Sequence, residues 1–203
     1  MGAGPLLPEI QTDLGVSHAV AGLLGTIPVL CMGVFAPVAA PLASRAGLRN
    51  VVGASVGAVA LFGLARAAAP GAPLVLLLTL PIGVGMAIAG ALLPVAVKER
   101  FPDRPAFANG VCTSGLNGGA ALASLVAVPT ADAFGGWRAA LTLFSIAAVV
   151  QCIGWLALSR RAWTTRRNES SRLPVRRPVV WMITSVFALQ SVVFYGITLI
   201  AGR

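Results

Sequence analysis

Long apolar stretches without formal charge alternate along the chain with short polar connectors. A helix needs about 20 apolar residues to cross the hydrocarbon core of a bilayer. The charged residues fall almost entirely between these stretches, so the pattern predicts an all-α polytopic membrane protein. The stretches are residues 14–44, 51–65, 67–97, 105–131, 139–159 and 178–202.

Composition points to lipid as the solvent of this chain. Hydrophobic residues make up 57% and charged residues 10% of the 203 residues, and the mean hydropathy is +0.88. Soluble domains carry about 25% charged residues. We therefore expect a multi-pass protein of the cell (cytoplasmic or inner) membrane, with the lipid bilayer as a partner. The excess of basic residues is explained by the connectors, so no nucleic-acid partner is expected.

The basic residues are distributed unequally between alternate connectors. The first, third and fifth connectors contain two, three and seven Lys or Arg residues, whereas the second contains only Arg66 and the fourth only Arg138. Cytoplasmic loops are enriched in Lys and Arg. This predicts that the first, third and fifth connectors are cytoplasmic. Trp137 and Trp155 are expected at the outer and inner membrane boundaries.

The two ends of the sequence predict an incomplete arrangement of helices. Residues 1–8 form an apolar run too short to span a membrane, and the last apolar stretch has no returning helix. We expect residues 1–159 to form an N-terminal half with a truncated first helix. Residues 160–177 are expected to be a basic cytoplasmic linker, and residues 178–203 the first helix of a second half.

Polar residues inside the apolar stretches are candidate binding groups. Asn109, Thr113, Asn117 and Ser124 share an arc of about 80° at 100° per residue. Polar groups face lipid at a cost, so this stripe should face a neighbouring helix or a wet cavity, and both interpretations stay open. The other candidates in apolar stretches are Gln151, Gln190, Ser191 and Tyr195.

The sequence shows no group of residues arranged for catalysis, metal binding or cofactor binding. Cys31, Cys112 and Cys152 are scattered and odd in number, which favours neither a disulfide framework nor a metal site. His18 follows Ser17, a candidate N-cap, and has no nucleophile at a suitable position. We therefore expect no enzyme activity, metal or cofactor. The pairs Gly53–Gly57 and Gly115–Gly119 form small-xxx-small patterns that predict close helix packing.

Residues 40–49, APLASRAGLR, resemble the cytoplasmic loop motif between the second and third helices of major facilitator superfamily transporters. Arg45 and Gly47 match that motif, Ser44 replaces its acidic residue, and Arg49 is displaced by one position. We expect Gly47 to permit a tight turn and the two arginines to hold the inner side. Four further runs resemble the cyanate/nitroimidazole-type (CynX/NimT) branch. They are residues 4–24, 97–104, 135–141 and 188–196.

This resemblance implies twelve helices in two halves, with a substrate site between the halves near the membrane midplane. The chain would hold the end of helix 1, helices 2–6 and helix 7, and so a partial fold. It implies alternating-access transport of a small polar or anionic solute. The alternative is a non-transporting fragment, or a half that requires a second half-transporter chain. The expected cavity-lining residues are Thr113, Asn117, Gln151, Gln190, Ser191 and Tyr195.

Overall fold

A computed structural model describes residues 11–13, 15, 17–134 and 136–162, and the regular elements within them are helices. The chain divides into two units, residues 1–168 and 169–203, and the described residues all belong to the first. The expected helix over residues 178–202 lies outside them. The helices are α2 (His18–Ala46), α3 (Leu48–Ala67), α4 (Ala72–Arg100), α5 (Pro105–Phe134) and α6 (Trp137–Ala162).

All five of these helices are long and apolar enough to cross a membrane. Large apolar side chains are exposed on all five, with one on α3 and several on each of the others, and Leu125 on α5 and Leu158 on α6 are among the most exposed at 71% and 78%. Contiguous apolar surface of this kind is rare on soluble monomers and suits contact with lipid tails. The prediction of an all-α membrane protein is therefore confirmed for the described residues.

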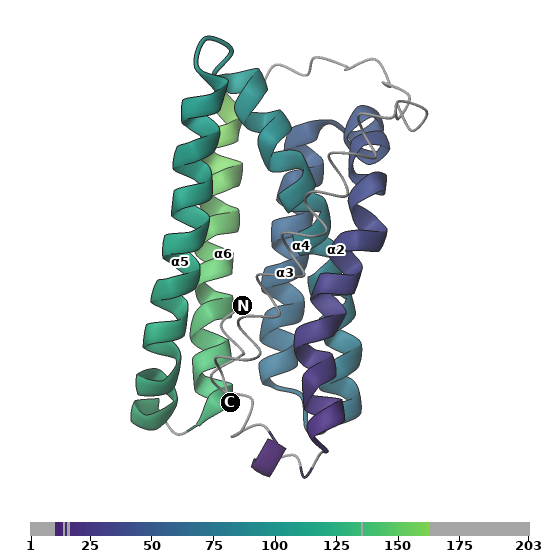
Figure 1. Cartoon of the computed structure of the whole chain (residues 1–203), viewed down its shortest axis with the longest axis vertical. Helices are drawn as coiled ribbons and strands as arrows, with labels where there is room; N and C mark the ends of the chain where they lie inside the picture. Colours follow the sequence, from purple (N-terminus) through teal and green to yellow (C-terminus); the bar gives the residue numbers. More distant parts are fainter. Residues whose placement is uncertain (1–10, 14, 16, 135, 163–203) are drawn as a thin grey trace. The chain divides into compact units, whose positions relative to one another are not determined.

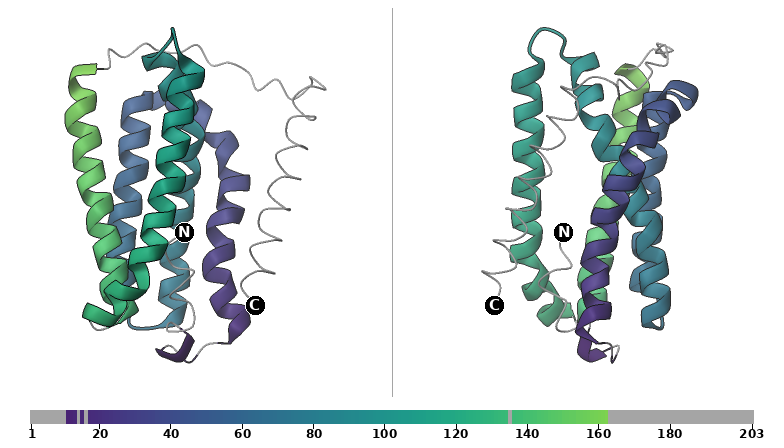
Figure 2. Two further views of the ribbon diagram at one scale, coloured as in Figure 1. Left: turned by 60° about the vertical axis from the view of Figure 1, so that its left-hand side comes forward. Right: turned by 45° about the vertical axis from the view of Figure 1, so that its right-hand side comes forward.

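The helices alternate in direction and pack in a chain of neighbours. α4 packs extensively against both α2 and α3, α3 packs against α6, and α5 makes fewer contacts, mainly with α6. The α2–α3 and α4–α5 connections lie at one end of the unit, and the α3–α4 and α5–α6 connections lie at the other (Figures 1 and 2). We call the first the basic end, because Arg45, Arg49, Lys98 and Arg104 lie there.

A single residue, Gly47, separates α2 from α3. Its φ is +83° and its ψ is 138°, a combination that costs residues with a Cβ about 1–3 kcal/mol. The Gly47 N–H donates to the Ala43 carbonyl at 2.9 Å, and its own carbonyl accepts from the Val51 N–H at 3.1 Å. Gly47 therefore ends one helix and starts the next, which gives the tight turn that the sequence predicts.

Several basic residues expected in the connectors lie instead in the end turns of helices. Arg45 is in the last turn of α2, Arg66 in the last turn of α3, and Lys98 and Arg100 in the last turn of α4. Cations are favourable at helix C-termini, where the carbonyl ends of the peptide dipoles gather. The connector expected to hold Arg66 is in fact formed by residues 68–71.

The core consists of two clusters at opposite ends of the unit. At the basic end, Ala39, Val51, Val52, Ile88 and Leu92 join α2, α3 and α4. At the opposite end, the cluster draws on all five helices, and it includes Trp137 and the end of α5. On α5, burial is confined to Ala127, Thr130 and Ala131. The preceding part of α5 is therefore largely uncovered.

Glycines and other small residues set the spacing between α3 and α6. A Cβ on Gly53 would lie 3.1 Å from Leu156, and one on Gly57 would lie 3.6 Å from the Cys152 sulfur. The close packing predicted for this pair is confirmed. For the second pair, Gly115 and Gly119 on α5, no described atom lies within 4 Å of the place that a Cβ would take.

Candidate functional site

The polar stripe of α5 lies on the uncovered part of that helix. Asn109, Thr113, Asn117 and Ser124 are all exposed. The Thr113 hydroxyl donates to the Asn109 carbonyl at 2.9 Å, and the Ser124 hydroxyl donates to the Ala120 carbonyl at 3.0 Å. Both hydroxyls thus satisfy their donor within the helix and keep acceptor capacity. The exposed Asn117 amide can both donate and accept.

The remaining predicted lining residues are divided between α6 and the part of the chain outside the described residues. Gln151 is exposed on α6, the main neighbour of α5. Gln190, Ser191 and Tyr195 lie outside the described residues. The structure therefore brings Thr113 and Asn117 onto one helix face and places Gln151 on the adjacent helix.

The loop motif is built around Arg49, which ties α3 to α6. The Arg49 Nε donates to the Ser159 hydroxyl at 2.8 Å, and an Nη donates to the Leu156 carbonyl at 3.4 Å. In return, the Trp155 indole N–H donates to the Arg49 carbonyl at 3.1 Å. Arg49 thus satisfies a carbonyl near the C-terminus of α6, where a cation is favourable.

The other two polar residues of the loop motif are oriented differently from Arg49. The Ser44 hydroxyl donates to the Pro41 carbonyl at 2.8 Å, within its own helix. Arg45 is exposed, and its guanidinium makes no hydrogen bond or ion pair with the described residues. The two arginines of the motif therefore differ. Arg49 joins two helices, whereas the Arg45 guanidinium can bind a group from outside the described residues.

A second arginine ties α3 to α6 at the opposite end. Arg138, the second residue of α6, donates to the carbonyls of Ala67 and Ala69 at the C-terminus of α3. Its guanidinium lies 4.5 Å from the centre of the Trp137 ring, a cation–π distance. An Nη is 3.8 Å from the Asp13 carboxylate. The cluster links the segment before α2 to both helices.

Trp137 is the first residue of α6, at the end of the unit opposite the basic end. Its side chain is only 2% exposed, and its indole N–H donates to the Asp13 carboxylate at 3.0 Å. The tryptophan is buried because it belongs to the core cluster at that end of the unit. The Gly-Gly-Trp-Arg run marks this position in the sequence. The hydrogen bond could not be foreseen, because Asp13, which accepts it, lies more than a hundred residues away in sequence.

Arg66 is a partly buried charge that sequence reasoning placed in a connector. One Nη lies 3.5 Å from the Thr79 hydroxyl, and Nε is buried without a partner among the described residues. Thr79 itself is fully buried and donates to the Val75 carbonyl at 2.7 Å. Charged groups within membrane segments are costly and tend to be buried among protein groups. The sequence feature that could have revealed this partly buried arginine is its position as a single charge within an otherwise apolar run over residues 51–97.

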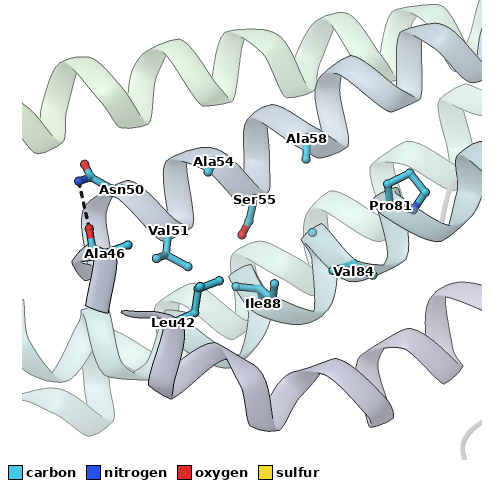
Figure 3. Close-up of a pocket in the computed structure, with 11 residues that line it drawn as sticks. Leu42, Ala46, Asn50, Val51, Ala54, Ser55, Ala58, Pro81, Val84 and Ile88 are labelled. Carbon is cyan, nitrogen blue, oxygen red and sulfur yellow. Dashed lines mark hydrogen bonds between the residues drawn. The ribbon is translucent and has the colours of Figure 1, made fainter. Parts of the chain in front are cut away.

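An apolar groove of about 550 Å³ lies between α2, α3 and α4 (Figure 3). Its polar lining residues are Asn50 and Ser55, and the Asn50 amide already donates to the Ala46 carbonyl at 3.1 Å. This groove does not have the hydrogen-bonding groups that a polar solute needs. The α5 stripe is therefore the better candidate for solute binding.

Comparisons with known proteins agree with the resemblance seen in the sequence. The pattern of the Major Facilitator Superfamily matches residues 1–202. The chain is 31% identical to the 2-nitroimidazole transporter of Escherichia coli (strain K12), over 97% of the chain and 51% of that protein. It is 30% identical to the cyanate transport protein CynX of the same strain, over 92% of the chain and 49% of that protein.

A third relative comes from Bacillus subtilis (strain 168). The chain is 32% identical to its uncharacterized transporter YycB, over 95% of the chain and 48% of that protein. The chain thus spans about half the length of the curated relatives it matches. These relatives are of the type that the four sequence runs predict, so the resemblance is confirmed.

Proposed function

Because the chain belongs to the Major Facilitator Superfamily, we propose that it forms part of a secondary transporter for a small polar or anionic solute. Transport would proceed by alternating access, with one half of the transporter rocking against the other around a site near the midplane. The setting would be the cytoplasmic membrane, with the basic end toward the cytoplasm. The proposed activity is transport rather than catalysis.

The names of two relatives support this class of solute. One relative is named for 2-nitroimidazole and the other for cyanate. Both are small molecules whose oxygen or nitrogen atoms accept hydrogen bonds. A site for such a molecule needs a few polar donors in an otherwise apolar wall.

The uncovered polar face of α5 is the observation that carries the proposal. Asn117 and Thr113 are one helical turn apart and exposed on the same face. An amide donor in a membrane interior interacts with a solute more strongly than it would in water, since the dielectric constant is low. We propose that Gln151, Gln190, Ser191 and Tyr195 complete the lining.

Uptake into proteoliposomes tests the assignment. Purified protein would be reconstituted, and entry of radiolabelled cyanate and of 2-nitroimidazole would be measured separately. Removing one hydrogen-bond partner of the solute should lower uptake by about tenfold. We expect this loss for Asn117→Leu, Thr113→Val and Gln190→Leu.

Matched controls separate binding from folding. Leu116 and Ser114 are exposed neighbours of Asn117 and Thr113 on α5. Leu116→Ala and Ser114→Ala should leave uptake unchanged. Unchanged uptake in Asn117→Leu and Gln190→Leu would show that these side chains do not line the solute path.

A second candidate function is a half-transporter that works only with another polypeptide. The mass of the native protein decides between this candidate and a full-length transporter. An antibody against residues 160–177 would measure the mass of the native protein in its own membranes. A band at 20.6 kDa, with uptake only after a second chain is added, would support this candidate. A band near twice that mass would support a full-length transporter.

A further inference from the structure

The groove between α2, α3 and α4 has the form of a site for one lipid tail. α2 and α3 both pack extensively against α4 and touch each other little. The resulting space is open along part of its length and has a volume of about 550 Å³, within the range of small-ligand sites. Leu42 from α2, Ala54 and Ala58 from α3, and Val84 and Ile88 from α4 are among its lining residues (Figure 3).

Small side chains on α3 create the space. Ala54 and Ala58 are one turn apart and leave a shallow strip where larger residues would fill the groove. On α4, Gly85 lets the two helices approach closely at the base of the groove, since a Cβ there would lie 2.7 Å from the Ser55 carbonyl oxygen. The helices span a membrane, so hydrocarbon is the surrounding medium of this space.

A cation lies next in sequence to the basic end of the groove. Leu42 and Ala46 line the groove, and Arg45, which is not itself a lining residue, immediately precedes Ala46 in the last turn of α2. Arg45 is exposed and makes no hydrogen bond or ion pair with the described residues. Its neighbour Arg49 is already bound to α6 through Ser159. Arg45 is thus the arginine of this turn that can receive an anion from outside the protein.

We propose that this groove binds an anionic phospholipid of the leaflet at the basic end. One acyl chain lies against Ala54, Val84 and Ile88, and the phosphate pairs with Arg45. A guanidinium matches phosphate geometry with two parallel hydrogen bonds. Basic pockets between membrane helices at the cytoplasmic side bind anionic head groups in this way. The site requires only that these helices span a membrane, and it is independent of the proposed transport.

Native mass spectrometry of the purified full chain can count the bound lipids. The two probes are phosphatidylglycerol, which is anionic, and phosphatidylcholine with the same acyl chains, which has no net charge. Both are added at equal concentration in detergent. We expect one phosphatidylglycerol to be retained at collision energies that remove phosphatidylcholine.

Two variants test the two parts of the site. Ala54→Phe fills the groove and should abolish the retained lipid. Its control is Ala65→Phe, an exposed alanine of the same helix outside the groove. Arg45→Gln should weaken phosphatidylglycerol binding by about fivefold and leave phosphatidylcholine unaffected. Its control is Arg104→Gln, an exposed arginine at the same end.

The outcomes decide between the proposal and its rivals. Loss of the bound lipid in Ala54→Phe and weakening in Arg45→Gln, with both controls unchanged, supports it. Equal retention of both lipids, or equal weakening by Arg45→Gln and Arg104→Gln, overturns it, since binding would then not depend on this arginine. Retention of phosphatidylglycerol by Ala54→Phe also overturns it. If Ala54→Phe does not fold, the pair Arg45→Gln and Arg104→Gln still decides the matter.

Discussion

Gly85 shows how one missing side chain sets the distance between two helices. A Cβ at this position would lie 2.7 Å from the Ser55 carbonyl oxygen and 2.9 Å from a Val59 methyl. The first of these atoms belongs to the backbone of α3 and cannot move without moving the helix. Membrane helices depend on such close approach, because lipid gives no hydrophobic drive for their association.

We expect Gly85→Ala to lower the stability of the protein. The added methyl forces α4 away from α3, and overpacking of this kind costs about 1–3 kcal/mol. Thermal unfolding in detergent, followed by tryptophan fluorescence, measures the effect. Gly90→Ala on the same helix is the control, since nothing lies within 4 Å of its Cβ position. Equal melting temperatures for the two variants would contradict the close contact.

Sequence alone predicts some of these single-residue roles and misses others. Gly47 could be predicted, because residues 40–49 resemble the cytoplasmic loop motif of the family and Gly47 matches its glycine. The close packing of Gly53 and Gly57 follows from their spacing, whereas the identity of the partner helix, α6, comes from the structure. Gly85 could not be singled out, because it lies among several glycines of α4 and its role depends on Ser55 of another helix.

At the scale of elements, α3 and α6 form a pair that is fastened at both ends. At the basic end, the Trp155 indole donates to the Arg49 carbonyl and the Arg49 side chain donates to the Ser159 hydroxyl. At the other end, Arg138 donates to the carbonyls at and just after the C-terminus of α3. Between these points, Gly53 and Gly57 permit close contact with α6. α5, in contrast, is buried only near its C-terminal end.

A double-mutant cycle measures the fastening at the basic end. Arg49→Gln and Ser159→Ala should each destabilise the protein, and the double variant should lose less than the sum. Polar interactions between membrane helices have coupling energies of about 0.6 kcal/mol on average, with a maximum of about 1.7. We expect a value in this range from unfolding in detergent. The control cycle of Arg104→Gln with Ser159→Ala should give none, because Arg104 makes no side-chain contact with Ser159.

The helices could be predicted more completely than their contacts. The lengths of the apolar stretches and the positions of the charges were enough to place all five described helices. The predicted and observed ends of these helices differ by only a few residues. The tie between Asp13 and Trp137 was not predictable, because each residue has an ordinary role at a membrane boundary when taken alone. The polar stripe of α5 was visible from its helical spacing, whereas three of the residues proposed to complete the lining lie outside the described residues.

At the scale of the whole molecule, the distribution of charge predicts the direction in which each helix crosses the membrane. The helix ends and connections at the basic end carry most of the Lys and Arg residues of the described part of the chain, whereas the opposite end carries only Arg66 and Arg138. Such asymmetry orients helices during insertion, with the basic connections left in the cytoplasm.

Cysteine labelling from each side of the membrane tests this orientation. In a variant with Cys31, Cys112 and Cys152 replaced by alanine, Asp103→Cys should react with an impermeant maleimide only from the cytoplasmic side. Pro70→Cys should react only from outside, because the α3–α4 connection lies at the opposite end. Labelling of both from the same side would disprove the predicted topology.

The single-residue junction at Gly47 limits how α2 and α3 can move. One residue of extended chain spans at most about 3.6 Å, whereas sliding a helix by one turn requires about 5.4 Å. α2 therefore cannot slip by a turn along α3 unless one of them unwinds. The connection between α3 and α4, residues 68–71, is several times longer and contains enough chain for such a shift. The longer connection therefore leaves room for α3 and α4 to shift relative to each other at one membrane surface. At the other surface, the Gly47 junction holds the ends of α2 and α3 together.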